Sequence, residues 1–308
     1  MTAQAAIPRP TTEAPYRLFP VTVRRLTRLS PSFLRVTFTG ADLCAFADNG
    51  RDQRIKLLFP APVGGHPDLP DGRDWYAHWR GLPDQCRPPL RTYTVRAARP
   101  EQREVDVDMV LHGDGGPAAR WAGGARPGDP LVLVGPNARH PGDHGGTAFR
   151  PPRDDAPLLI AGDETAVPAA AAILAGLPGT ARGEALLEVP HPEDALPLDV
   201  PTGVRVTWLP RAGAAHGAAL VPAVTAAATR LHPGPAAHHA GPVEAPDAAD
   251  LLWDVPDAPP HSAALYAWLA GEAGVIRTLR RHLVSERGLD RRAVAFMGYW
   301  RIGHAETA

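Results

Sequence analysis

Cysteine is almost absent from this chain of 308 residues, and its scarcity removes whole classes of redox protein. Cys44 and Cys86 stand alone, and no C-x-x-C pair occurs. An iron–sulfur cluster held by cysteine alone needs four such ligands, and so does a zinc site built only from cysteine. Any redox cofactor of this protein is therefore organic, or is held by other ligands.

Long apolar runs and an excess of charge of one sign are also missing. No run of about 18 apolar residues occurs, and the first residues lack the apolar core of a signal peptide, so we expect a cytoplasmic protein without membrane insertion. The net charge of −1 gives no reason to expect nucleic acid as a partner. Lysine is nearly absent, since Lys56 is the only one in the chain.

The first half of the chain has the pattern of a small β domain, and the total length favours two domains. Residues 1–15 predict a frayed tail. Between residues 16 and 136, six short segments rich in β-branched and aromatic residues predict a six-stranded antiparallel barrel, with one helical segment at 116–125. The Pro/Gly/Trp-rich residues 60–88 predict a surface loop.

The second half alternates strand and helix patterns. Residues 137–156 are rich in Pro and Gly and predict a linker. From 157 to 308, buried strand segments alternate with helical ones, which predicts an α/β domain with a parallel sheet. An Ala/Pro/His-rich insertion at about 211–260 contains one helical patch and several histidines. The histidines of this insertion, and His140 with His144 in the linker, lie in low-complexity loops and have no carboxylate or cysteine partner at i, i+4 spacing, so we assign no metal ligand.

Arg91-Thr92-Tyr93-Thr94 lies on a predicted barrel strand. A flavin nucleotide needs an aromatic face for its ring, a hydroxyl near the ring nitrogens and a cation for its pyrophosphate, and this tetrapeptide supplies all three. Arg91 and Tyr93 share one face of the strand. By itself the tetrapeptide also fits an ordinary edge strand with solvated Arg and Thr.

A glycine-rich turn, HGDGGPA, precedes the helical segment of the first domain. Glycines before a helix N-terminus let backbone N–H groups converge on an anion, and the helix dipole favours that charge. The turn predicts a diphosphate site, although a plain glycine-rich turn has the same pattern. Its candidate residues are His112, Gly113, Gly116, Pro117, Ala118 and, on the helix, Trp121.

Three turns of the second domain carry further candidates. GDET follows the first strand and opens a helix, which places Asp163, Glu164 and Thr165 where a nucleotide contact or a helix cap lies. The motif is not G-x-G-x-x-G, so the usual dinucleotide signature is absent. AGE follows a later buried strand, and GYWR lies near the C-terminus. Their candidate residues are Gly271, Glu272 and Trp300.

Each motif alone is weak, but their order along the chain is specific. RTYTVR, HGDGGPAARWA, PGD, GDETAVPA, AGE and GYWRIG follow one another from about Phe19 to Glu306. In this arrangement the sequence closely resembles the siderophore-interacting protein family of ferric-siderophore reductases, which are relatives of the ferredoxin-reductase superfamily. The resemblance implies an FAD-binding barrel followed by an NAD(P)-binding α/β domain.

The resemblance also implies roles for the candidate residues and names the partners. NADPH or NADH would reduce FAD, with ferredoxin as another possible donor, and a ferric siderophore would accept the electrons and release ferrous iron. Contacts to the flavin and its phosphates are implied for Arg91, Tyr93, Thr94, His112, Gly113, Gly116, Pro117 and Ala118. Contacts to the nicotinamide nucleotide are implied for Asp163, Glu164, Thr165, Gly271 and Glu272.

An anionic siderophore needs a local cationic patch in a protein of net charge −1. Lys56 and Arg301 match the family's basic pocket residues, and Arg139 in the linker is a weaker candidate. A solvated Lys56 and a C-terminal cap at Arg301 are the alternative. Two other functions stay open: a general NAD(P)H:flavin or quinone oxidoreductase, and a non-catalytic flavin- and siderophore-binding protein. We expect a monomer.

Overall fold

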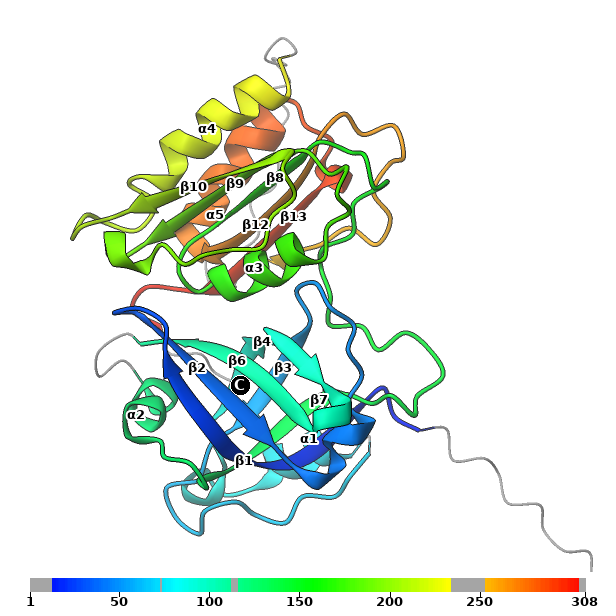
Figure 1. The fold of residues 1–308 in the computed structure, drawn as a ribbon, viewed down its shortest axis with the longest axis vertical. Helices are drawn as coiled ribbons and strands as arrows, with labels where there is room; N and C mark the ends of the chain where they lie inside the picture. The colour runs from blue at the N-terminus through cyan, green and yellow to red at the C-terminus, as the bar shows by residue number, and fades with distance from the viewer. Residues whose placement is uncertain (1–12, 73, 112–115, 234–252, 305–308) are drawn as a thin grey trace, which may run out of the picture.

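The computed structural model describes residues 13–72, 74–111, 116–233 and 253–304. An antiparallel barrel sheet forms the lower body in Figure 1, and an α/β unit lies above it. Among the described residues, no helix combines the length and apolar character that crossing a membrane requires.

The barrel sheet has seven strands in the order β4-β3-β7-β1-β2-β6-β5, and neighbours run antiparallel. The predicted barrel architecture is confirmed, with β5 as a short strand that the sequence pattern missed. A helix, α2, lies between β6 and β7. The strands are β1 Tyr16–Arg28, β2 Phe33–Thr39, β3 Arg54–Leu58, β4 Leu90–Thr94, β5 Ala97–Arg99, β6 Glu104–Val110 and β7 Pro130–Pro136, and α2 is Pro117–Gly124.

The segment 60–88 lies mostly at the surface, as predicted, but it is not all loop. The segment contains a helix, α1 (Trp75–Gly81), and buries Trp79 in an apolar cluster with Leu58 and Leu90 on the outer face of the sheet. The indole Nε1 of Trp79 donates to the carbonyl oxygen of Pro88 at 2.9 Å. The sequence did not predict this helix, because proline and glycine on both sides of it interrupt the helical pattern.

The α/β unit has six strands in the order β10-β9-β8-β12-β13-β11, and all neighbours are parallel except the β11–β13 pair. The parallel-sheet prediction is confirmed. The strands are β8 Leu158–Gly162, β9 Gly183–Val189, β10 Val204–Pro210, β11 Trp253–Asp254, β12 Tyr266–Glu272 and β13 Val294–Trp300. The helices are α3 Val167–Ala175, α4 Leu220–Leu231 and α5 Ala273–Arg280, which a π-helical turn at Arg281–Glu286 extends. Short 3₁₀ turns occupy Ala41–Ala45, Asp84–Cys86, Pro100–Gln102, Pro192–Asp194 and Arg291–Ala293.

Both faces of this sheet are buried, which explains its nearly continuous apolar strands. Ile160 and Trp268 pack in the cluster that includes α3, whereas Leu159 and Leu269 pack in the cluster with α4 and α5. Figure 1 shows α3 beneath the sheet, on the side of the barrel, and α4 with α5 on the opposite side.

The strand order reverses between β8 and β12. From β8 the chain proceeds outward to β9 and β10, and from β12 it proceeds the other way to β13. In open parallel sheets, ligands bind outside the carboxyl ends of the strands at such a reversal. Gly162 and Glu272 end these two strands, so the topology places the GDET and AGE turns side by side.

Two fully buried carboxylates fasten the barrel to the α/β unit. Asp194 accepts from the hydroxyl groups of Ser30 and Ser32, at 2.6 and 2.7 Å, and from the Ser32 amide at 2.9 Å. Asp52 accepts from the Nε1 of Trp268 at 3.0 Å. Apolar packing joins the halves as well, because Phe33 of the barrel belongs to the core cluster of α3.

We predict that Asp194→Ala will destabilise the protein by about 3 kcal/mol, because three buried donors lose their acceptor. The measurement is the free energy of unfolding in denaturant. Glu193→Ala is the matched control, since Glu193 lies exposed in the same 3₁₀ turn. Equal stabilities of the two variants would contradict a stabilising role for Asp194.

Candidate functional site

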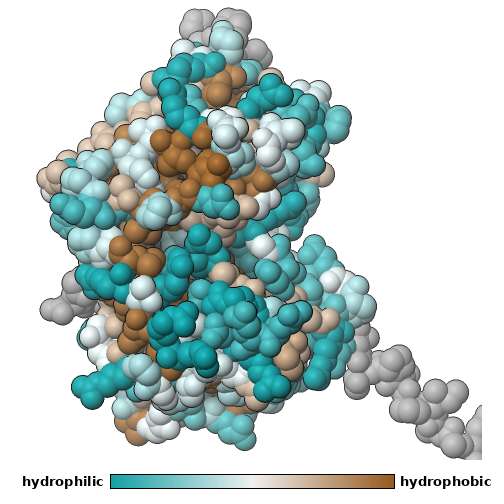
Figure 2. Space-filling model, in the orientation of Figure 1, coloured by the Kyte–Doolittle hydropathy of each residue, from teal (hydrophilic) through white to brown (hydrophobic). Residues whose placement is uncertain are grey.

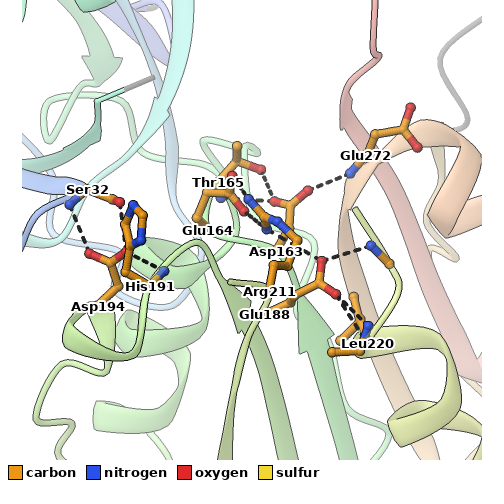
Figure 3. A network of polar contacts seen from close by, with 12 residues as sticks. Ser32, Asp163, Glu164, Thr165, Glu188, His191, Asp194, Arg211, Leu220 and Glu272 are labelled. Carbon is orange, nitrogen blue, oxygen red and sulfur yellow. Dashed lines mark hydrogen bonds and ion pairs between the residues drawn. The ribbon is translucent and has the colours of Figure 1, made fainter. Parts of the chain in front are cut away.

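Asp163 lies at the strand reversal, where sheets of this kind have their ligand crevice. Its Oδ1 accepts from the amide and the hydroxyl of Thr165, at 2.9 and 2.5 Å. Its Oδ2 accepts from the amide of Glu272 at 2.8 Å and from the indole Nε1 of Trp300 at 2.9 Å. One buried carboxylate thereby joins the GDET, AGE and GYWR turns (Figure 3 shows the bonds to Thr165 and Glu272).

The pKa of Asp163 is raised above its ordinary value. Burial, and after it the nearby Glu164 carboxylate, raise the pKa of Asp163 to about 6. The hydrogen bonds from Thr165 and Trp300 act in the opposite direction. A carboxyl group with such a pKa in a crevice is a candidate for a functional role.

Glu164, next to Asp163, forms a buried ion pair with Arg211. Arg211 donates to both oxygens of Glu164, from Nη1 at 2.6 Å and from Nη2 at 2.8 Å, and approaches Glu188 at 3.5 Å. The Glu188 carboxylate accepts the amides of Gly217, Ala219 and Leu220 at 2.9–3.0 Å. The pairing fixes the segment after β10 against the ends of β8 and β9 (Figure 3).

The sequence analysis missed Glu188, Arg211 and His216. Arg211 and His216 lie at the start of the insertion, whose composition predicts a loop, and Glu188 lies inside an apolar strand. The imidazole of His216 contacts the Trp300 ring, with centroids 4.8 Å apart and planes at 78°. Only Glu188 could have been noticed in the sequence, because a charged residue within an apolar strand requires a buried partner.

Asp163, Glu164 and His216 offer ligand atoms within 4.8 Å of one another. Arg211 occupies both oxygens of Glu164, and four donors occupy Asp163. The two carboxylates are therefore saturated by hydrogen bonds, and the cluster is better described as a polar network than as a metal centre.

The AGE turn is shaped by the same carboxylate. Gly271 has a φ of 147°, and a Cβ at this position would lie 2.7 Å from the Asp163 Oδ2. Only glycine allows the turn to approach Asp163 so closely. Glu272 caps α5, since its side chain accepts from the Val275 amide at 2.9 Å. Its carboxylate therefore has a structural partner in addition to any nucleotide contact.

In the barrel, β4 places the RTYT motif next to β3. Tyr93 pairs with Ile55 and Arg91 with Leu57, and both partners belong to the barrel core. Arg91 and Tyr93 therefore share one face, as predicted. Thr92 faces the other way with its partner Lys56, whose Nζ donates to the Thr92 hydroxyl at 2.7 Å.

The α2 end of the glycine-rich turn is open. Gly116 is the N-cap of α2 with a φ of 139°, and a Cβ added there would meet nothing within 4 Å. Pro117 and Ala118 begin the helix. Trp121 instead packs on the barrel core, with its ring 6.2 Å from Phe38 and 5.4 Å from Phe59. His112 and Gly113 lie outside the described residues.

The two other predicted basic residues lie in different parts of the chain. Arg139 follows β7, and its amide donates to the Asn137 side chain at 3.1 Å. Arg301 follows β13 directly, and its backbone forms an isolated antiparallel β-bridge with His304. Arg301 therefore lies next to Trp300 of the crevice.

Together, an antiparallel barrel with a flavin-type strand motif and a parallel sheet with a crevice at its strand reversal define the class of flavin-dependent oxidoreductases with the ferredoxin-reductase fold. The barrel carries the residue types that FAD needs: a helix N-terminus at Gly116, which has no side chain, and an arginine and a tyrosine on one face of β4. A ferredoxin reductase of carbazole 1,9a-dioxygenase has this fold, with a TM-score of 0.59 at 16% identity over 93% of this chain and 70% of that one.

Within this class, the chain belongs to the siderophore-interacting protein family. The family model of the siderophore-interacting FAD-binding domain matches residues 22–140, and that of the siderophore-interacting protein matches 156–303. A siderophore utilization protein from T. fusca has a similar crystal structure, with a TM-score of 0.71 and 30% identity over 96% of this chain and 97% of that one.

Proteins of named activity are among the relatives. An uncharacterised protein of Mycobacterium tuberculosis is 37% identical over 95% of this chain and 92% of its own length. The ferric vibriobactin reductase ViuB of Vibrio cholerae is 31% identical over 91% of this chain and 88% of its own. An NADPH-dependent ferric-chelate reductase of Escherichia coli is 34% identical over 48% of this chain and 53% of its own.

We predict that the contribution of Asp163 to stability falls as pH rises. Its pKa of about 6 in the folded protein exceeds its ordinary value near 4. The folded state therefore binds the proton more tightly, and the stability gained from neutral Asp163 is lost as pH rises through about 6. The melting temperature of wild type minus that of Asp163→Asn should decrease between pH 4.5 and 7.5. A difference that is constant or increases with pH would contradict this assignment.

Proposed function

We propose that this oxidoreductase is a ferric-siderophore reductase, which passes electrons from NAD(P)H through FAD to a ferric siderophore and releases ferrous iron. The observation that carries the proposal is the convergence of the GDET, AGE and GYWR turns on Asp163 at the strand reversal. In Figure 1 the chain leaves β13 on the side of the α/β unit that faces the barrel. Relatives that reduce ferric vibriobactin and ferric chelates support the choice of acceptor.

The barrel residues would hold FAD by charge and shape. Arg91 would pair with the pyrophosphate, Tyr93 would contact the ring, and Thr94 would donate a hydroxyl hydrogen bond. At Gly116 the backbone can approach a phosphate closely because no side chain intervenes. Bound FAD would supply the conversion of a two-electron donor into one-electron steps.

The crevice residues would receive the nicotinamide nucleotide. Thr165 and Trp300 are both fixed by Asp163, so they present a prearranged surface at the strand ends. A donor of this kind belongs to the cytoplasm, where we place the reaction. The E. coli relative supports NADPH as the donor, and ferredoxin is the alternative.

The reaction balances with two acceptors for each donor. NAD(P)H gives up a hydride, whose two electrons reduce two ferric ions while its proton is released to solvent. Reduction lowers the charge of the iron, which weakens its attraction to the hard anionic oxygens of the siderophore. The chain must then attract the anionic ferric chelate, for which Lys56 and Arg301 are the proposed cations.

The first prediction from this function concerns the cofactor. Arg91→Ala should weaken FAD binding by about 2–4 kcal/mol if the pyrophosphate contact excludes water. Equilibrium dialysis against FAD measures it. Arg126→Ala is the control, because Arg126 is an exposed barrel arginine in the α2–β7 loop. Equal FAD affinities of the two variants would remove Arg91 from the site.

The decisive test measures the release of ferrous iron. Anaerobic NADPH or NADH should bleach the flavin absorbance, and a ferric tris-catecholate should restore it, with two ferrous ions trapped per nucleotide oxidised. Lys56→Glu should raise KM for this anionic chelate, more at low salt than at high salt, without changing the bleaching. A protein that bleaches but yields no ferrous iron would be a different oxidoreductase.

A further inference from the structure

Trp253 is one of few large apolar side chains that the described residues leave exposed. It lies on β11, the antiparallel edge strand of the α/β sheet, and 46% of its surface is accessible. Figure 2 shows, on the face turned to the viewer, that apolar residues gather over the α/β unit while hydrophilic residues cover most of the barrel. An indole ring this open calls for a physical reason.

Contacts from both halves of the molecule fix the Trp253 ring. The guanidinium carbon of Arg54, from barrel strand β3, lies 4.5 Å from the ring centroid. The ring of Tyr299 is stacked at 6.0 Å, with an interplanar angle of 18°. Tyr299 in turn meets Trp268 at 6.4 Å, and Asp52 holds the Trp268 indole. The exposed ring is therefore ordered in advance, so binding to it costs little conformational entropy.

Positive charge lies beside this ring. Arg54 and Lys56 are two residues apart on β3 and so point to the same face, about 7 Å apart. None of the ion pairs of the described residues joins Arg54 to a carboxylate, and its buried Nη1 has no hydrogen-bond partner. A buried N–H group without an acceptor is costly, so an anion that accepts from this guanidinium would offset the cost.

We propose that Trp253 and Arg54 select the substrate of this enzyme, favouring ferric siderophores with aromatic catecholate ligands over aliphatic hydroxamates. The inference rests on the proposed function and extends it. An aryl ligand packs on the open part of the indole, and the negative charge of a ferric tris-catecholate meets Arg54 and Lys56. An aliphatic tris-hydroxamate complex is uncharged and has no ring, so it gains from neither contact.

The competing explanation is that Arg54 and Trp253 only fasten β3 to β11. A fastening role affects stability and every substrate equally, whereas a specificity role affects aromatic ligands alone. Truncation of Trp253, with one ligand of each class, separates the two.

The experiment measures binding of gallium complexes to the oxidised, FAD-loaded protein by calorimetry. Ga³⁺ resembles Fe³⁺ in charge and size but is not reduced, so binding is observed without turnover. The probes are a gallium tris-catecholate and a gallium complex of a linear aliphatic tris-hydroxamate. The variants are Trp253→Ala, Trp253→Phe and Arg54→Met, with Tyr76→Ala as the control at another exposed aromatic residue.

We expect Trp253→Ala to weaken tris-catecholate binding about tenfold, with FAD content and hydroxamate binding unchanged. Trp253→Phe should restore most of the affinity, Arg54→Met should weaken catecholate binding more at low salt, and Tyr76→Ala should change nothing. Catecholate binding that is absent in wild type, unchanged in Trp253→Ala, or lost together with hydroxamate binding overturns the inference. If the gallium complex binds as expected but the ferric complex is not reduced, the proposed function fails and the binding site stands.

Discussion

The buried carboxylate of Asp52 is central to the way the two halves of the molecule are joined. It belongs to the barrel, yet it accepts the amides of Ala148 and Phe149 in the connecting segment and the indole of Trp268 on the central strand β12. A carboxylic acid side chain out of water is tolerated only when hydrogen-bond donors such as these surround it. The bonds therefore have to form together, and they bring the barrel against the α/β sheet in one arrangement.

The crevice at the strand reversal depends on that arrangement. Asp163 organises the crevice in the same way that Asp52 organises the junction, with one buried acceptor and donors from distant turns. Asp194 adds a third such carboxylate on the side of Ser30 and Ser32. A surface held by buried hydrogen bonds changes shape only at a large cost in free energy, which suits a site where two electron carriers must meet in fixed geometry.

The positions of the cationic residues matter more for the proposed function than the net charge of −1. Lys56 is the only lysine of the chain, and it lies on the β3 face that also carries Arg54. Arg211, by contrast, forms ion pairs with Glu164 and Glu188. A basic residue near the strand reversal can thus have a structural role, as Arg211 has.

The sequence by itself determined the order of the elements, the barrel and parallel-sheet architecture, and the family. Strand alternation, helix spacing and turn motifs are local properties, because each depends on residues that are only a few positions apart in the sequence. Asp163, Thr165 and Trp300 were found this way because each lies at the end of a recognisable strand. What only the tertiary structure decided are the partnerships: Arg211 with Glu164, Asp52 with Trp268, and Arg54 with Trp253. Partners separated by 47 to 216 residues leave no periodic signal, because the chain must first fold before burial removes the water that would otherwise satisfy them.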